Sequence, residues 1–240
     1  MGPPKGQFKV ICVFTLLLWT VNATSQVAPP PLQQTFFDSQ FYLLEVMTDF
    51  ERYRNGQGQA DVYGQLSGHL IQFRSHFDAL TTAPALPEAD RDALQQHWQS
   101  LARNLSALLV TVRQGGFIDQ EIRYQYQEQV SLLWQHLLGL SLAEREPDQT
   151  EQLILLLQLA NLRYMEAQWR LAPYAELSLP QMADAIEARF SALPDAPADI
   201  SRKWPLLHKA LQQEGGSMSF IVNRYAGDLV TLLRQQRALD

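Results

Sequence analysis

Hydrophobic residues recur at helical spacing along most of the chain, and residues 150–171 carry the strongest pattern. In this stretch apolar side chains fill two stripes, and only Gln152, Arg163, Glu166 and Arg170 share a narrow polar strip. A helix that is apolar on nearly every side has to be covered by neighbours, so it belongs in the middle of a bundle. We therefore predict that this helix is central to the fold, with the Arg163 side chain on its polar, solvated side.

The same spacing, interrupted at glycines and prolines, predicts further helices before and after the central one. They cover about 36–54, 59–80, 88–114 and 119–142, and three more begin at about Ser178, Trp204 and Ser217. Asp148 followed by Glu151 has the pattern of a capping box at the start of the central helix. The alternation of period two that is typical of strands does not occur, so the sequence predicts an all-α fold. Gly64 and Gly68, one turn apart in the second helix, predict a close approach of a neighbouring backbone.

Several segments in the first half of the chain resemble segments in the second half. Residues 77–85 are similar to 190–198, the glycine pair 115–116 recurs at 215–216, and 130–133 are similar to 230–233. The matching segments keep the same order relative to the predicted helices, which is the pattern of an internal repeat. We therefore predict a tandem duplication of an antiparallel four-helix unit, with about eight helices in all. The first repeat covers 35–143 and the second covers 148–240, and the sequence leaves open whether they share one core.

The N-terminal residues have the pattern of an export signal. Lys5 and Lys9 precede an apolar run of about twelve residues, and Val21-Asn22-Ala23 matches a cleavage site. We predict a signal peptide over 1–23, followed by a proline-rich spacer over 24–34. An uncleaved membrane anchor is the alternative, and it is the one case in which we expect contact with the membrane. Cys12 is the only cysteine of the chain, so the mature protein is expected to contain neither a disulfide nor a reactive thiol.

Charge and composition narrow the range of partners. The net charge is −6 and no basic cluster occurs, which argues against nucleic acid as a partner. The basic residues are mostly arginine, and Lys203 and Lys209 are the only lysines beyond residue 23. Together with the export signal, this composition favours an extracytoplasmic location, most simply the bacterial periplasm.

Arginine followed by tyrosine recurs on the first and fourth helices of each predicted repeat. Because these helices are neighbours in an up-and-down bundle, their guanidinium groups could line a groove that holds a carboxylate or phosphate. The alternative is that each arginine lies along the edge of the core with its head in water. Two amides on the apolar side of the central helix are further candidates. The candidate binding residues are Arg52, Arg123, Arg163, Tyr164, Asn161, Gln168 and Arg224.

The sequence contains no catalytic motif that we recognise. His69 and His76 share a helix face, but seven residues place them about 10.5 Å apart, too far to bind one metal ion. We therefore predict no catalytic residue, no metal ligand and no cofactor. The favoured function is an exported, non-enzymatic helical bundle that docks on another protein of the cell envelope through a helical face. The alternative is a bundle that binds a small anionic ligand.

Overall fold

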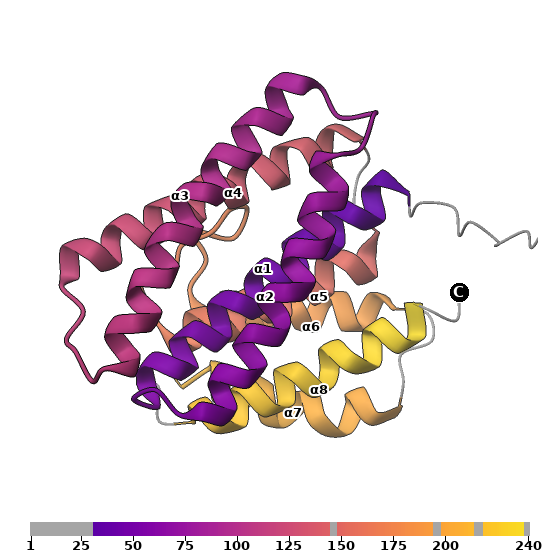
Figure 1. Ribbon diagram of the computed structural model, residues 1–240. Coiled ribbons are helices and arrows are strands. Elements are labelled where there is room, and N and C mark those ends of the chain that lie inside the picture. The colour runs from indigo at the N-terminus through magenta and orange to yellow at the C-terminus, as the bar shows by residue number, and fades with distance from the viewer. Residues whose placement is uncertain (1–30, 145–147, 194–197, 214–217, 238–240) are drawn as a thin grey trace, which may run out of the picture.

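The computed structural model describes residues 31–144, 148–193, 198–213 and 218–237, and within these ranges every regular element is a helix (Figure 1). The prediction of an all-α fold is therefore confirmed. The described helices are α1 (Leu32–Asn55), α2 (Ala60–Thr81), α3 (Glu88–Arg113), α4 (Gln120–Glu144), α5 (Gln149–Met165), α6 (Leu179–Ala192), α7 (Ala198–Leu211) and α8 (Ser219–Arg237). Residues 1–30, which hold the predicted signal peptide and most of the predicted spacer, lie outside the described residues, as does the glycine pair 215–216.

Two helix starts follow directly from local chemistry. The Asp148 carboxylate accepts a hydrogen bond from the Glu151 backbone N–H, and the Glu151 side chain accepts one from the Asp148 N–H, so the predicted capping box is present. Ser178 and Gln181 make the same reciprocal pair at the start of α6. Each box gives hydrogen-bond partners to backbone N–H groups that have none inside the helix.

The central helix is shorter than its hydrophobic pattern predicts. It ends at Met165, and Glu166 already has an extended backbone. Trp169 and Leu171 are nevertheless buried, because the irregular segment after α5 folds back onto the core. The Trp169 indole donates a hydrogen bond of 3.1 Å to Glu51 of α1, so tertiary contacts replace the helical continuation that the spacing predicted.

Two other helices begin earlier than predicted. α1 starts at Leu32, inside the predicted spacer, and α7 starts at Ala198 and contains Pro205. Proline removes one hydrogen bond to the carbonyl four residues earlier, here that of Ser201. Ser201 is exposed, so water can satisfy that carbonyl and the helix continues through the proline.

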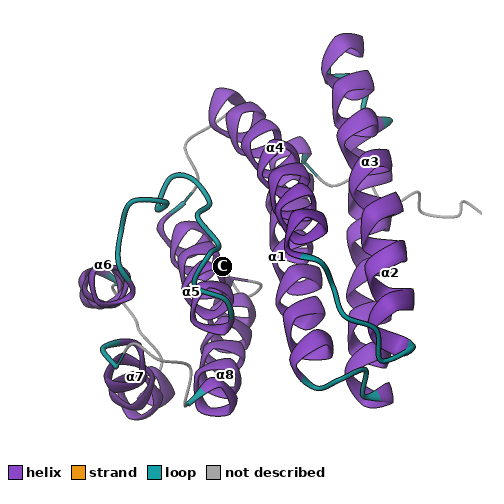
Figure 2. Cartoon of the chain, turned by 90° about the vertical axis from the view of Figure 1, so that its left-hand side faces the viewer, coloured by secondary structure: helices purple, strands orange, loops and turns teal. Residues whose placement is uncertain are grey.

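Helices α1 and α5 form the centre of the molecule together. α1 contacts α2, α3, α4 and α5, while α5 contacts α1, α6 and α8. Every residue of α5 from Leu153 to Tyr164 is buried, Arg163 included, and α1 is buried along most of its length as well. Figure 2 shows α1–α4 on one side of the molecule and α5–α8 on the other. The α1–α5 contact joins these two groups.

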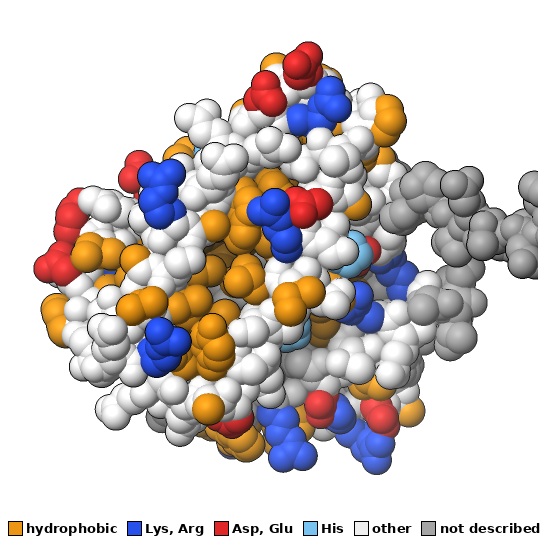
Figure 3. Space-filling model, in the orientation of Figure 1, with side chains coloured by type: hydrophobic (Ala, Val, Ile, Leu, Met, Phe, Trp, Pro, Cys, Tyr) orange, Lys and Arg blue, Asp and Glu red, His pale blue; other side chains and the backbone are white. Residues whose placement is uncertain are grey.

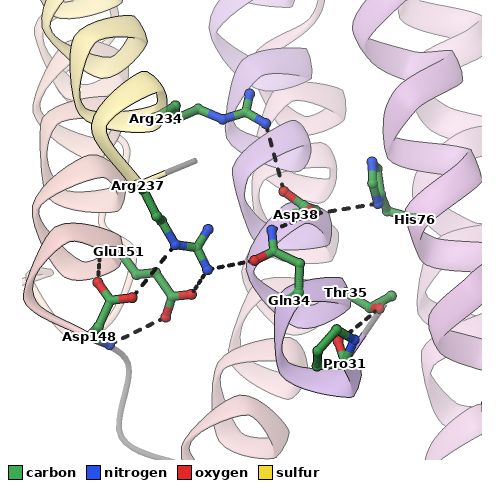
Figure 4. A network of polar contacts seen from close by, with 9 residues as sticks. All are labelled: Pro31, Gln34, Thr35, Asp38, His76, Asp148, Glu151, Arg234 and Arg237. Atoms are coloured by element: carbon green, nitrogen blue, oxygen red, sulfur yellow. Dashed lines mark hydrogen bonds and ion pairs between the residues drawn. The ribbon is translucent and has the colours of Figure 1, made fainter. Parts of the chain in front are cut away.

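One stripe of α1 is polar although most of it is buried, and α8 supplies its partners at one end. Arg237 donates a hydrogen bond of 2.6 Å to Gln34 of α1 and also binds the Glu151 carboxylate of α5 (Figure 4). Gln34 in turn donates to Asp38 at 2.7 Å. The Arg234 guanidinium lies 4.1 Å from the centre of a phenylalanine ring of α1. These contacts connect α1, α5 and α8 by charge as well as by packing.

The prediction for the glycines of α2 is wrong. Nothing lies within 4 Å of the position where a side chain would begin at Gly64 or Gly68, and both residues are exposed. No neighbouring backbone approaches them. Among the described residues, no helix is both long enough and apolar enough to cross a lipid bilayer.

Candidate functional site: an arginine cleft

A surface cleft of about 670 Å³ lies where the end of α1, the end of α3 and the start of α4 meet. We call it the arginine cleft. The loop between α3 and α4 forms one wall and contains Gly115, whose φ of +69° is a conformation that favours glycine. The residues that line the cleft are Arg54, Gln57, Val112, Gly115, Gly116, Phe117, Ile118, Gln120 and Arg123.

Two arginines that line the cleft, from different helices, bind the same carboxylate. Arg54 of α1 donates to Glu166 Oε2 at 2.9 Å, and Arg123 of α4 lies 2.8 Å from the same oxygen. Arg54 also donates to Glu51 Oε2 at 2.9 Å, and Arg123 donates to Gln168 at 3.2 Å. The two guanidinium groups are thus held in place by the segment that follows α5, and both also face the cleft.

Glu51 is a buried carboxylate that supports Arg54 from the core. Burial raises the pKa of the Glu51 carboxyl, while the Arg54 charge and the hydrogen bonds from Arg54 and Trp169 act in the opposite direction. The Tyr126 ring packs edge-on against Trp169, with ring centres 5.8 Å apart. Burial also raises the pKa of the Tyr126 hydroxyl well above its usual value, so this tyrosine stays neutral. Two buried aromatic side chains therefore lie beside the carboxylate that binds Arg54.

The lining of the cleft carries basic and apolar side chains. Its lining contains two arginines and no carboxylate, although both arginines are paired with Glu166, which is not a lining residue. Phe117 on its rim is 90% exposed, and Ile122 and Tyr124 in the first turns of α4 are also exposed. In the view of Figure 3, hydrophobic side chains gather on the left half of the face that carries α3. A ligand group that is anionic and borders an apolar surface would match this arrangement.

The structure does not bring the predicted binding residues into one groove. Arg123 lines the arginine cleft and donates a hydrogen bond to Gln168. Arg52 and Asn161 instead line a second pocket, between α1, α2, α5 and α8. Arg224 is exposed on α8. The four helices of the arginine–tyrosine pairs therefore present their guanidinium groups in different places.

Arg163 and Tyr164 each make a hydrogen bond to a distant backbone group. Arg163 is only 8% exposed, which contradicts the prediction of a solvated side chain, and its guanidinium donates to the Leu177 carbonyl. The Tyr164 hydroxyl accepts a hydrogen bond of 3.2 Å from the Met218 backbone N–H. The prediction of a solvated Arg163 is wrong because the segment between α5 and α6 folds over the face of α5 on which Arg163 lies.

Sequence reasoning missed Arg54 and Phe117. Arg54 lies in the last turn of α1, where a basic residue is ordinary because it complements the helix dipole. Phe117 and Ile118, directly after the paired glycines, were the available signal, since two apolar residues in a glycine loop need an explanation. Among the described residues, no three His, Cys, Asp or Glu side chains gather closely enough to bind a metal ion. No protein-family model, curated protein or solved structure matches the chain.

Proposed function

We propose that the protein is an exported, non-enzymatic interaction protein of the cell envelope, which docks on a partner protein through the arginine cleft. The observation that carries this proposal is the lining of the cleft, with Arg54 and Arg123 but no carboxylate, beside the almost fully exposed Phe117. Arginine is among the residues that contribute most to the binding energy of protein interfaces, and aromatic residues, phenylalanine included, are enriched in them. The partner is expected to present an acidic side chain or a C-terminal carboxylate next to an apolar residue.

The energy available in the cleft is enough for recognition. A hydrogen bond from a charged group contributes on the order of 1.5–3 kcal/mol, and both guanidinium groups keep N–H donors beyond those that bind Glu51, Glu166 and Gln168. Burying a phenylalanine that is 90% exposed adds roughly 1.5–3 kcal/mol. Because Glu166 already holds both arginines in position, less side-chain freedom is lost when a partner binds.

A crosslinking experiment tests the docking face. A photoreactive amino acid replaces Phe117 in one variant and Phe220 in another, since both phenylalanines are highly exposed but Phe220 does not line the cleft. We expect a specific crosslinked partner at position 117 in cells, and its loss when Arg123→Ala is added. Equal crosslinking at both positions, or a crosslink that survives Arg123→Ala, would refute docking through the cleft.

Binding of a small organic anion is the second candidate. The cleft volume of about 670 Å³ falls in the range typical of small-molecule sites and supports this alternative. Benzoate and inorganic phosphate are suitable probes, because they separate an anion on an apolar body from an anion alone. We expect benzoate to raise the melting temperature of the wild type and not that of Arg123→Ala. If the crosslink at position 117 forms but benzoate does not raise the melting temperature, the protein partner is favoured.

The location outside the cytoplasm is part of the proposal. Its support is the sequence of 1–23, with Lys5 and Lys9 before a short apolar run and a small residue, Ala23, at its end. The mass of the native protein tests it. A chain that begins near Thr24 supports export with cleavage, whereas a cytoplasmic protein that keeps these residues rules it out.

We also infer that the two groups of four helices are copies of one unit. Within each group the helices make the same ring of contacts, each with the next and the first with the fourth. Phe77 packs on Trp98 with ring centres 6.0 Å apart, and Phe190 packs on Trp204 at 5.1 Å. The buried residues Leu94, Trp98, Leu101 and Leu105 have counterparts in Ile200, Trp204, Leu207 and Leu211. An experimental structure in which 36–142 and 150–238 follow different paths would refute this.

A further inference from the structure

Glu166, directly after α5, binds both arginines that line the arginine cleft. Its carboxylate oxygen Oε2 lies 2.9 Å from Arg54 Nη2 and 2.8 Å from Arg123 Nη2. The Glu166 side chain is 16% exposed and does not belong to the lining of the cleft. Glu166 therefore influences a bound ligand through the two guanidinium groups, as a positioning residue, and not by touching it.

The charge that the cleft offers to a ligand depends on Glu166. A guanidinium group keeps its charge in proteins, so Arg54 and Arg123 bring two positive charges to the cleft. The Glu166 carboxylate cancels one of them. Glu51 is the second carboxylate here, but of the two arginines it binds only Arg54, and it is buried in the core. In the described part of the chain, no other acid forms an ion pair with either arginine.

The segment that carries Glu166 is anchored on both sides of this residue. The Glu166 backbone N–H donates to the Leu162 carbonyl at 3.0 Å, in the last turn of α5. Three residues further on, the indole of the buried Trp169 donates to Glu51 at 3.1 Å. The Glu166 carboxylate is therefore expected to stay beside the arginines when an anion enters the cleft.

We propose that Glu166 determines the charge selectivity of the arginine cleft, so that the cleft binds a monoanionic carboxylate in preference to a dianionic phosphate. This inference rests on the proposed function, because it concerns the ligand of the same cleft. Coulomb attraction grows with the product of the charges, and Glu166 both reduces the positive charge and repels a second negative one. A dianion also loses more hydration on binding. The expected partner group is therefore an acidic side chain or a C-terminal carboxylate, and not a phosphorylated residue.

Benzoate and phenyl phosphate test this selectivity on the full chain, because they share an aromatic ring and differ in the anionic group. At pH 8 benzoate carries one negative charge and phenyl phosphate nearly two, since the second pKa of a phosphate monoester is about 6. Isothermal titration calorimetry at constant ionic strength gives both dissociation constants. We expect the wild type to bind benzoate more tightly. Equal or tighter binding of phenyl phosphate would overturn the proposal, and this test needs no variant that has to fold.

Glu166→Gln keeps the size of the side chain and removes its charge. The ratio of the two dissociation constants should shift at least tenfold towards phenyl phosphate in this variant. Glu166→Asp retains the charge and should keep the wild-type preference. A purely structural role of Glu166 would weaken the binding of both probes alike, so an unchanged ratio in a folded Glu166→Gln protein would refute the proposed selectivity.

Glu121→Gln is the matched control. Glu121 is exposed in the first turn of α4, two residues before Arg123, and its side chain accepts a hydrogen bond from Gln125 at 3.4 Å. The ratio should stay unchanged in Glu121→Gln, and an equal shift would assign the selectivity to the overall charge of the chain and sink the proposal.

Glu51 requires a control of its own. Burial raises the pKa of the Glu51 carboxyl and the Glu166 charge raises it further, so Glu166→Gln also favours an ionised Glu51. The same tenfold shift is expected when Glu166→Gln is compared with wild-type Glu166 in a Glu51→Gln background, and its absence there would contradict a direct role of Glu166. If the wild type binds neither probe, the proposed selectivity is wrong, whereas the crosslink at position 117 still decides whether a protein docks on the cleft.

Discussion

Replacement of Arg163 by alanine tests whether a buried cation holds the segment between α5 and α6. The Arg163 guanidinium donates to the Leu177 carbonyl, and its Nη1 lies 3.9 Å from the sulfur of Met182 in α6. Arg163→Ala therefore removes a charged hydrogen-bond donor and leaves the Leu177 carbonyl without it. The substitution also removes the methylene groups that fill the space between α5 and the segment after it.

The structure sets the expected size of the effect. Loss of a hydrogen bond to a charged group costs about 1.5–3 kcal/mol. The lost packing increases this cost, whereas relief of the desolvation of a buried charge lowers it. We expect a net loss of about 2–4 kcal/mol in the free energy of unfolding. For a chain of this size, a loss of about 3 kcal/mol lowers the melting temperature by roughly 6–12 °C.

Urea denaturation followed by circular dichroism measures this loss. Arg224→Ala is the matched control, because Arg224 lies exposed on α8 and its replacement should change stability by less than about 0.5 kcal/mol. Arg163→Met separates the two contributions, since methionine keeps most of the packing but not the donor. If Arg163→Ala is as mild as Arg224→Ala, the guanidinium does not hold this segment and our account of its role is wrong.

Three further predictions concern stability and processing. Leu157→Ala on α5 should cost about 2–5 kcal/mol by urea denaturation, because Leu157 is buried in the core and its truncation leaves a cavity. Glu51→Gln should lose less stability than the wild type as the pH rises from about 4 to 7. Burial raises the pKa of Glu51 in the folded protein. The proton on Glu51 therefore stabilises the wild-type fold at low pH, and this stabilisation is lost as the pH rises through the raised pKa. Mass spectrometry of the native protein should find a chain that begins near Thr24.

The helices could be predicted from the sequence because their apolar stripes and end signals are local. The hydrophobic residues of α3 repeat at helical spacing, and all of those that define its stripe, from Leu94 to Val112, are buried. The end of α5 could not be predicted in the same way. Residues beyond Met165 keep a helical pattern, but Glu166 and Trp169 are drawn into contacts with α1 and α4, which lie far away in the sequence.

The arginine cleft was only partly predictable for the same reason. Arg123 was recognised from a recurring dipeptide, and that pattern also selected Arg163, which is buried and structural. The dipeptide pattern predicts where a residue lies on its own helix, but not which other element covers that residue. Arg54 reaches the cleft because α1 ends beside the loop between α3 and α4, and this placement depends on packing between distant segments.

The acidic stripe of α1 shows how much a closer reading of the sequence could have given. Asp38 and Glu45 are seven residues apart, and His69 and His76 are also seven apart. The pairs Asp38–His76 and Glu45–His69 are both centred on residue 57, in the short turn between α1 and α2, and each pair is 3.7 Å apart in the structure. An antiparallel hairpin of two helices requires this symmetry, so the two contacts between acids of α1 and histidines of α2 were present in the sequence as matched spacing. The contacts of α1 with α5 and α8 had no such signal, because no short turn fixes the position of those helices relative to α1.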